Sequence, residues 1–365
     1  MKPRIIIDAN IPYIRGTFDK VAEVEYLTAK EITSQAVKSA DALIIRTRTI
    51  CNADLLDSSN VKFIATATIG IDHIDTDYCH AHNIAWTNAP GCNAESVAQW
   101  VGSALAVWAN KYNCSLSGKT IGIVGHGHVG KRVERLARLL GMNVLLNDPP
   151  LAIHTPNQYV DLQTIARQCD VITFHTPLTR EGEFATLGLA GKEFFEQIKE
   201  NTLIINAARG GIINEKALLS KYCPPVLGGR AQRAEGVDNS QLATRNSQLF
   251  DFAIDCWEGE PETNNELRKK ALIATPHIAG YSADGKLNAT QQVVQAVARF
   301  FNIQPEAIEG LPPKSTTTAT GNALKDLLLH NYNILADSDA LKSEPHKFEH
   351  FRSNYPIRRE LKIES

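Results

Sequence analysis

The sequence lacks several features that would mark whole classes of protein. Its 365 residues contain no uninterrupted apolar run near the ~20 residues that a membrane-spanning helix needs. The first residues lead into a short apolar strand and do not resemble a signal peptide. There is also no excess of one charge, because 38 Lys and Arg face 40 Asp and Glu, for a net charge of −2. We therefore expect neither a nucleic acid nor a membrane as partner.

Cysteine pairs at close spacing are also missing. The seven cysteines are scattered and include no CxxC pair; they stand at positions 51, 79, 92, 114, 169, 223 and 256. We interpret them as reduced thiols of a cytoplasmic protein. Two short clusters, Cys79-His80-Ala81-His82 and the pair His126 and His128, lack a second half at ligand spacing. We expect no metal site and interpret these histidines as surface or loop residues.

Short β-branched apolar runs alternate with helical stretches along most of the chain, which is typical of a parallel sheet covered on both faces. The first set of predicted strands is Arg4 to Ile7, Ala42 to Arg46, Lys62 to Ala67 and Ile84 to Thr87. The second set is Thr120 to Val124, Asn143 to Asn147, Val171 to His175, Leu203 to Asn206, Phe252 to Cys256 and Ala271 to Thr275. The sequence thus predicts an α/β protein with two doubly wound parallel sheets in series.

Two long helical stretches set the predicted domain boundaries. The first, Ala94 to Trp108, leads away from the first set of strands. The second carries Leu287, Val294 and Val297 on one face and is long enough to cross back. We therefore predict a discontinuous first domain, residues 1–93 with 283–305, and a second domain, residues 94–282. Residues 306–365 form a Pro-, Thr- and Gly-rich linker and a charged helical end, predicted as a small C-terminal α+β segment.

Residues 222–250 break the regular spacing of the second domain. A connection between a helix and a strand normally takes only a few residues, whereas this stretch is long, repeats Asn-Ser-Gln-Leu and carries three arginines. We interpret it as an insertion without function of its own, with a partner-binding loop as the alternative.

A glycine-rich turn predicts the cofactor. Gly125-His126-Gly127-His128-Val129-Gly130 follows an apolar strand and opens a helix. This is the context in which a dinucleotide pyrophosphate binds at a helix N-terminus. Asp148, which follows the next strand, can accept hydrogen bonds from the adenosine ribose and would repel a 2′-phosphate. We predict NAD, bound by Gly125, Gly127, His128, Val129, Gly130 and Asp148.

Three further motifs follow successive strands of the second domain. Asn206-Ala207-Ala208-Arg209-Gly210-Gly211 offers an arginine suited to a bidentate grip on a carboxylate. Asp255 to Pro261 contains Glu260, and Thr275 to Tyr281 contains His277. Because the carboxyl ends of parallel strands share one edge of the sheet, we expect Arg209, Glu260 and His277 to converge there on the nicotinamide.

These motifs resemble those of the D-isomer-specific 2-hydroxyacid dehydrogenases. The matching stretches are Gly70 to Asp75, Asn88 to Gly91, the glycine turn, Asn206 to Gly211, Asp255 to Pro261 and Pro276-His277. A branch of that family that oxidises a phosphorylated hydroxy acid is more similar still. Its matching stretches are Ala89 to Ala94, Asp148-Pro149-Pro150, Phe174 to Leu178, Pro276 to Tyr281 and Phe351 to Glu360.

The resemblance implies NAD-dependent oxidation of a phosphorylated hydroxy acid at C2. His277 would be the general base, a role that suits an imidazole titrating near neutrality. Glu260 would orient His277, and Arg209 would pair with the substrate carboxylate. The resemblance also implies cofactor contacts from Thr176, Ala207, Asp255 and Gly280, and substrate contacts from Arg46, Thr47, Thr68 and Tyr281. It further implies a homodimer formed through the C-terminal segment.

Two alternatives to this interpretation stay open at the level of sequence. Another D-2-hydroxyacid dehydrogenase, for 3-phosphoglycerate or glycerate, would keep the same catalytic residues and differ in the contacts of the first domain. A non-enzymatic NAD-sensing binding protein would use the same fold. The combination of arginine, glutamate and histidine favours an enzyme, because sensing needs no proton acceptor.

Overall fold

The computed structural model describes residues 2–222 and 250–364. The predicted insertion therefore lies, except for its two end residues, outside the described part of the chain. The chain divides into two compact units. The first is Met1–Ser96 with Gly280–Ser315 and Ile357–Lys362, and the second is Val97–Ala279 with Thr316–Pro356 and Ile363–Ser365. Within the described residues, no helix is both long and apolar enough to cross a membrane.

A five-stranded parallel sheet forms the centre of the first unit, in the order β2-β1-β3-β4-β5. Its strands are β1 (Arg4–Asp8), β2 (Glu23–Leu27), β3 (Ala42–Ile45), β4 (Phe63–Thr66) and β5 (Ala85–Thr87). Its helices are α1 (Ser34–Val37), α2 (Ala53–Leu56), α3 (Thr76–Ala81) and α12 (Ala283–Phe301). β2 is not among the predicted strands, because Glu23-Val24-Glu25-Tyr26-Leu27 at the sheet edge is too polar to resemble a buried strand.

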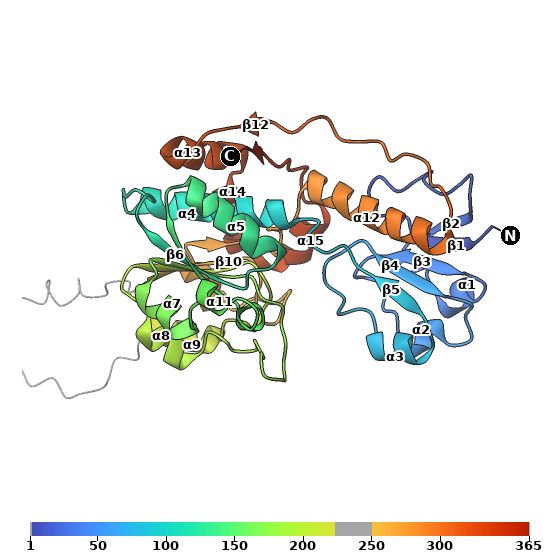
Figure 1. Cartoon of the computed structure of the whole chain (residues 1–365), viewed down its shortest axis with the longest axis horizontal. Helices are drawn as coiled ribbons and strands as arrows, with labels where there is room; N and C mark the ends of the chain where they lie inside the picture. Colours follow the sequence, from blue (N-terminus) through green and yellow to red (C-terminus); the bar gives the residue numbers. More distant parts are fainter. Residues whose placement is uncertain (1, 223–249, 365) are drawn as a thin grey trace, which may run out of the picture. The chain divides into compact units, whose positions relative to one another are not determined.

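The alternation of side-chain direction along β1 explains why helices cover both faces of this sheet. Ile6 packs with α1, α2 and α3 on one face, whereas Ile5 and Ile7 pack with Val293 and Val297 of α12 on the other. Figure 1 shows α12 and the three short helices on opposite sides of these strands. A strand buried on both faces has no polar side, which is why the first strands are continuous apolar runs.

A six-stranded parallel sheet forms the centre of the second unit, in the order β11-β10-β9-β8-β6-β7. Its strands are β6 (Thr120–Val124), β7 (Asn143–Asn147), β8 (Val171–Phe174), β9 (Thr202–Asn206), β10 (Phe250–Ile254) and β11 (Ile273–Ala274). Its helices before β10 are α4 (Ala94–Lys111), α5 (His128–Leu139), α6 (Pro149–Ala152), α7 (Leu162–Gln168), α8 (Lys192–Gln197) and α9 (Glu215–Tyr222), with a 3-10 turn η1 (Pro156–Gln158). α11 (Asn265–Lys270) precedes β11. The predicted fold class, two doubly wound α/β sheets, is confirmed.

The strand order of the second sheet changes direction between β6 and β8. β7 lies on one side of β6, and all later strands lie on the other side. Figure 1 shows α4 and α5 on one side of this sheet and α7, α8 and α9 on the other. In such sheets ligands bind outside the carboxyl ends of the strands at this point of reversal. The glycine turn after β6 therefore stands where a dinucleotide is expected.

The C-terminal segment, predicted as one element over residues 306–365, is divided between the two units. α13 (Gly321–Asn331), α14 (Ile334–Ser343), η3 (Pro345–Lys347) and α15 (Phe348–Ser353) belong to the second unit, and β12 (Thr316–Thr317) pairs with β13 (Lys362–Ile363). Residues 357–362 belong to the first unit instead. Glu360 accepts from Ser282 Oγ at 2.7 Å, and Arg359 pairs with Asp284 at 3.0 Å. Buried polar contacts with α12, not sequence proximity, decide where these residues pack.

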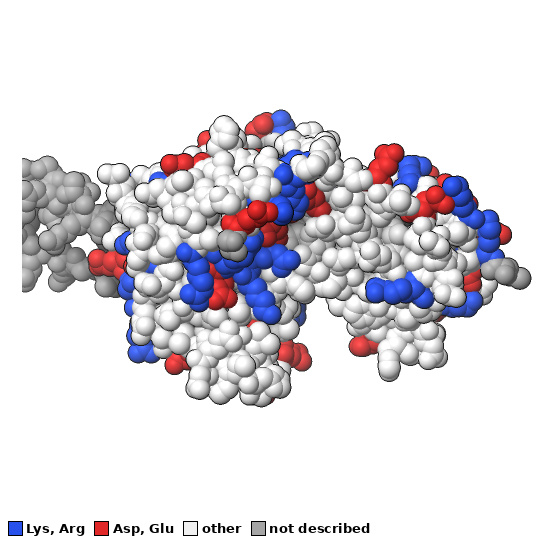
Figure 2. Space-filling model, turned by 45° about the horizontal axis from the view of Figure 1, so that its top comes forward, with Lys and Arg blue, Asp and Glu red and all other residues white. Residues whose placement is uncertain are grey.

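Charged side chains are mixed on the surface. Figure 2 shows Lys and Arg interspersed with Asp and Glu on the face drawn, as the near-neutral net charge implies.

Candidate active site

The glycine turn between β6 and α5 has the geometry of a phosphate-binding turn. Gly125 has φ +93°, and a Cβ there would lie 2.8 Å from the His175 carbonyl oxygen. A Cβ on Gly130 would clash with the carbonyl of Gly125, whereas one on Gly127 would meet nothing within 4 Å. Among the residues that the structure describes, no side chain caps the start of α5 at Gly127. The turn thus leaves open space in front of free backbone N–H groups at a helix N-terminus, where a pyrophosphate fits.

Asp148 lies beside this turn and accepts a hydrogen bond from its backbone. Its Oδ2 accepts from the backbone N–H of His126 at 2.7 Å, and its Oδ1 accepts from that of Leu151 at 3.2 Å.

The His126 side chain is buried and has two polar partners. Its Nε2 lies 2.7 Å from Glu134 Oε2, and its Nδ1 lies 3.1 Å from the Tyr159 hydroxyl. His126 is therefore a loop residue, as expected, but it is buried and not at the surface, because two polar partners stabilise the ring.

A further polar group at the carboxyl end of β8 fits a bound cofactor. The hydroxyl of Thr176 is buried and has no hydrogen-bond partner among the described residues. A buried hydroxyl without a partner normally costs free energy, so such groups often contact a ligand. Thr176 comes directly after His175, the residue that the tight turn at Gly125 approaches. The contact of Thr176 with the cofactor stays a prediction, for which this hydroxyl is available.

His277 and Glu260 form a hydrogen-bonded pair. His277 Nδ1 and Glu260 Oε2 are 2.8 Å apart, and Glu260 Oε1 accepts from the backbone N–H of Trp257 at 2.7 Å. Burial alone would raise the pKa of Glu260, but the hydrogen bond and charge of His277 and the charge of Arg352 lower it below its usual value. Glu260 is therefore a carboxylate that accepts a hydrogen bond from Nδ1–H of His277. Nε2 has no hydrogen-bond partner within the described residues and is the nitrogen available to a substrate.

Asp255 holds the turn that carries His277. Its Oδ1 accepts from Thr275 Oγ1 at 2.6 Å and from the backbone N–H of Ile278 at 2.8 Å, and its Oδ2 accepts from that of Ala279 at 2.9 Å. His277 itself has φ +55°, a left-handed conformation that a histidine adopts only when its surroundings impose it. A buried carboxylate thus holds the turn that orients the His277 imidazole.

Asn206 links the loop of Arg209 to the loop of Glu260. Its Nδ2 donates to the carbonyl of Arg209 at 2.9 Å and to the carbonyl of Cys256 at 3.1 Å. Gly210 packs so closely against the Trp257 carbonyl that a Cβ at this position would clash with it. The two loops therefore form one rigid edge, although 27 of the residues between them, 223–249, lie outside the described chain. Arg209 and Glu260 lie on these two loops, and His277, which pairs with Glu260, follows the next strand; the convergence of all three on a nicotinamide stays a prediction.

Glu215, which is not among the predicted site residues, is a buried acid that contacts the loop of Glu260. It starts α9 and accepts from the backbone N–H of Glu258 at 2.8 Å. Burial raises its pKa to about 7; the Glu258 N–H opposes this shift, and the charges of Glu258 and Glu260 add to it. Nothing in the sequence indicates this role, because a glutamate in the first turn of a helix is usually an ordinary helix-dipole partner.

We expect Glu215 to make stability depend on pH. Because its pKa is higher in the folded state, the folded protein binds the proton more tightly than the unfolded chain does. Stability should therefore fall as the pH rises from about 4.5 to about 7. Glu215→Gln removes this dependence. From about pH 4.5 to about 7, the free energy of unfolding of the variant should therefore rise relative to that of wild type by up to about 3 kcal/mol. Urea unfolding at several pH values measures the free energy of unfolding, and Glu193→Gln, at an exposed position, is the control. If the free energy of unfolding of Glu215→Gln changes with pH in the same way as that of wild type, the prediction is wrong.

Cys256, Glu260 and His277 place three potential metal-ligand atoms within 4.8 Å of one another. The donors are poorly suited to a metal, however. Burial and the charges of Asp255 and Glu260 raise the pKa of the Cys256 thiol well above its ordinary value, so the thiolate needed for coordination is disfavoured. Nδ1 of His277 is already bonded to Glu260. We interpret this cluster as a proton-transfer site.

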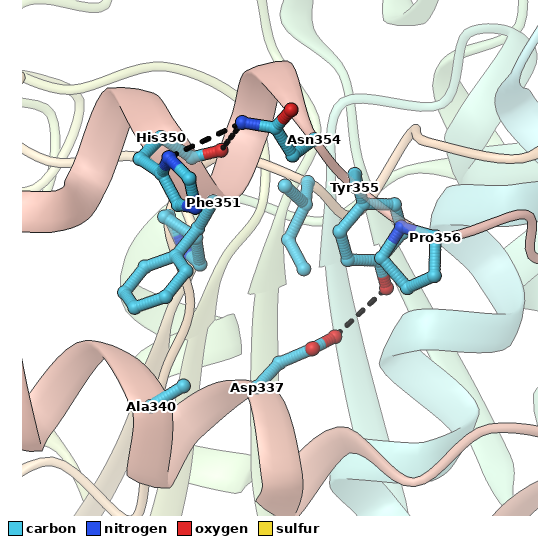
Figure 3. Close-up of a pocket in the computed structure, with 9 residues that line it drawn as sticks. Asp337, Ala340, His350, Phe351, Asn354, Tyr355 and Pro356 are labelled. Atoms are coloured by element: carbon cyan, nitrogen blue, oxygen red, sulfur yellow. Dashed lines mark hydrogen bonds between the residues drawn. The ribbon is translucent and has the colours of Figure 1, made fainter.

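The C-terminal helices support the strand that leads to His277. Ser338 of α14 accepts from the backbone N–H of Ala274 at 3.0 Å and so covers the open edge of β11. A cavity of about 110 Å³ lies beside this contact, and Pro276 and Ile278 line it on either side of His277. Figure 3 shows Tyr355 donating to Asp337 across this cavity, at 2.8 Å, and the pairing of His350 with Asn354. Among the described residues that line the cavity, His277 is absent, so the cavity lies on the other side of the 276–278 turn from the His277 side chain.

The predicted substrate residues belong to the first unit. Arg46 follows β3 and pairs with the buried Asp8 at 2.9 Å. Thr68 follows β4, lies 2.8 Å from Thr66 Oγ1 and donates to the carbonyl of Gly70 at 3.1 Å. Thr47 is exposed. Tyr281 and Gly280 also belong to this unit, whereas the sequence analysis placed both in the second domain. The close packing of Gly280 against Asn93 explains that difference.

Comparison with known proteins identifies the family. Residues 95–223 match the D-isomer specific 2-hydroxyacid dehydrogenase, NAD binding domain. The chain is 45% identical to an erythronate-4-phosphate dehydrogenase of Bacteroides thetaiotaomicron, over 98% of this chain and 97% of that protein. It is 37% identical to that of Porphyromonas gingivalis, over 98% and 94%.

A solved structure gives the same result for the fold. NAD⁺-bound 3-phosphoglycerate dehydrogenase of Entamoeba histolytica superposes with a TM-score of 0.65 and 26% identity, over 83% of this chain and 96% of that chain. The glycine turn, the buried hydroxyl of Thr176 and the His277–Glu260 pair thus lie in a fold known to hold NAD. The chain belongs to the D-isomer-specific 2-hydroxyacid dehydrogenases, among the erythronate-4-phosphate dehydrogenases, and is an NAD-dependent dehydrogenase.

Proposed function

We propose that this protein oxidises 4-phospho-D-erythronate at C2 to 3-hydroxy-2-oxo-4-phosphobutanoate, a step toward pyridoxal phosphate. The observation that carries the proposal is the His277–Glu260 pair, held at 2.8 Å beside the Arg209 loop. Identities of 37–46% to several erythronate-4-phosphate dehydrogenases support the choice of substrate.

His277 acts as the general base in this reaction. Its Nε2 takes the proton of the C2 hydroxyl, while the Nδ1 proton remains on the hydrogen bond to Glu260. The imidazolium that forms is stabilised by the Glu260 carboxylate, whose pKa is held below its usual value mainly by that same contact, which outweighs the effect of burial. Bound NAD supplies the hydride acceptor.

Arg209 binds the substrate carboxylate. A guanidinium can hold both carboxylate oxygens and polarise the oxygen at C2 as it becomes a carbonyl. The contacts of Asn206 to the Arg209 carbonyl and to the Cys256 carbonyl set the spacing between this group and Glu260. Asp255 contributes by fixing the His277 turn. Asp255, Ala207 and Gly280 stay proposed contacts of the nicotinamide half of the cofactor, as Thr47, Thr68 and Tyr281 do for the substrate.

The proposal is tested by NAD reduction with three acids side by side. We expect 4-phospho-D-erythronate to give a kcat/KM well above that of 3-phospho-D-glycerate and D-glycerate. A preference for a three-carbon acid would keep the mechanism and overturn the substrate. No turnover with any of the three, despite NAD binding, would overturn the proposed reaction.

Replacing Asp148 should change cofactor selectivity. Asp148→Asn keeps an oxygen for one of the two local backbone N–H groups and removes the charge that repels a 2′-phosphate. We expect the preference for NAD over NADP, measured as the ratio of kcat/KM values, to fall by about tenfold, which corresponds to about 1.4 kcal/mol. Asp161→Asn serves as control, because Asp161 is an exposed cap of α7. An unchanged ratio would mean that Asp148 does not face the ribose.

We further propose a cytoplasmic homodimer that uses the C-terminal segment. The six cysteines among the described residues are all unpaired, which suits a reducing compartment. Leu335 of α14 and Ile357 are exposed apolar side chains of this segment. Light scattering of the purified protein gives the mass directly.

A further inference from the structure

Two ends of neighbouring strands meet at the point of reversal of the first sheet. β2 lies on one side of β1, and β3, β4 and β5 lie on the other, so the reversal is between β1 and β3. Asp8 ends β1, and Arg46 directly follows β3. Their 2.9 Å ion pair spans this point, where doubly wound sheets bind ligands.

The net charge of the Asp8–Arg46 ion pair is close to zero. Asp8 is fully buried and its carboxylate accepts from both Nε and Nη2 of Arg46, at 2.9 and 3.4 Å. A phosphomonoester carries about −1.5 to −2 charges at pH 7. An arginine already neutralised by a buried aspartate can orient such a group through hydrogen bonds but supplies little net charge. A phosphate at this edge needs a further cation.

Lys286, in the first turns of α12, is placed to be that cation. Its Nζ lies 5.3 Å from the ring centroid of Tyr281, and this cation–π contact is its one ion or ring contact among the described residues. The side chain is exposed and so can be reached by a ligand. Desolvation of the ammonium, and after it the charge of Arg46, lowers the pKa of Lys286. The geometry that places Lys286 at the substrate residues is its contact with Tyr281, itself a predicted substrate contact, and the effect of Arg46 on the pKa agrees with that position.

We propose that Lys286 binds the phosphate of the substrate together with Arg46, and that it sets the preference of this enzyme for a phosphorylated acid. The inference rests on the proposed function. It adds a residue from α12 to the substrate contacts predicted on the strand ends, Thr47 and Thr68, and it gives Tyr281 a second role as the support of the Lys286 ammonium.

The test compares Lys286→Met with wild type on a matched pair of acids, 4-phospho-D-erythronate and D-erythronate. Methionine keeps an unbranched side chain of similar length and removes the charge. We expect kcat/KM for the phosphorylated acid to fall by about 10- to 100-fold, the loss typical of one charged hydrogen bond. The value for D-erythronate should be unchanged. Lys286→Arg should recover most of the loss, and exposed Lys30→Met should behave as wild type.

Binding of inorganic phosphate, measured by calorimetry, gives a readout independent of turnover. Weaker phosphate binding by Lys286→Met than by wild type and Lys286→Arg supports the site even if 4-phospho-D-erythronate proves not to be the substrate. Equal phosphate binding by all three proteins overturns it, as does an equal loss of kcat/KM on both acids. If wild type fails to oxidise 4-phospho-D-erythronate, the proposed function is wrong, and the phosphate titration alone decides the role of Lys286.

Discussion

His277→Asn is expected to lower kcat by about a thousandfold while leaving the affinity for NAD within a few-fold of wild type. The base removes the hydroxyl proton in the step that releases the hydride, and such a contribution is worth about 10² to 10⁴ in rate. Asparagine is the suitable replacement because position 277 has φ +55°, which asparagine tolerates better than most residues. Steady-state kinetics and a fluorescence titration with NADH measure the two quantities.

Glu260→Gln is the matched variant for this prediction. It keeps the shape of the pair, and its one oxygen can accept from His277 Nδ1 while its NH₂ faces the Trp257 N–H; the negative charge that stabilises the imidazolium is lost. Its kcat should fall less than that of His277→Asn. A His277→Asn enzyme that keeps more than a tenth of the wild-type kcat would show that another group takes the proton.

Asp255→Asn is expected to destabilise the protein by about 3 kcal/mol and to lower kcat as well. The carboxylate accepts three hydrogen bonds from the turn at 275–279, and two of the donors are backbone N–H groups. An amide would turn one NH₂ toward a donor, leaving a buried N–H unpaired, and hydrogen bonds to charged groups contribute about 1.5 to 3 kcal/mol. Chemical unfolding and kcat are measured on the same preparation.

Asp251→Asn separates the two effects. Asp251 is also fully buried on β10 and pairs with Lys111 at 2.7 Å, but it lies at the opposite end of the strand from the His277 turn. This variant should lose stability and keep kcat. If both variants lose stability and neither loses activity, Asp255 does not position His277.

Much of the fold and of the candidate site follows from local patterns. Strands such as Arg4–Asp8 are recognisable because burial on both faces demands continuous apolar runs. The glycine turn is recognisable because close backbone approaches tolerate only glycine at Gly125 and Gly130. His277 and Glu260 could be paired in advance because parallel strands bring their carboxyl ends to one edge.

Contacts between residues distant in sequence were decided by tertiary structure alone. Glu215 and Glu258 are 43 positions apart, and their contact depends on how α9 packs behind the catalytic loop. Arg46 is 38 positions from Asp8, yet the sheet order makes their strands neighbours, and α12 adds Lys286 from much later in the chain. The alternation of apolar residues determined that two parallel sheets form and which edges carry chemistry. Burial and charge, which exist only once the chain is packed, determined which acids and cations at those edges face each other.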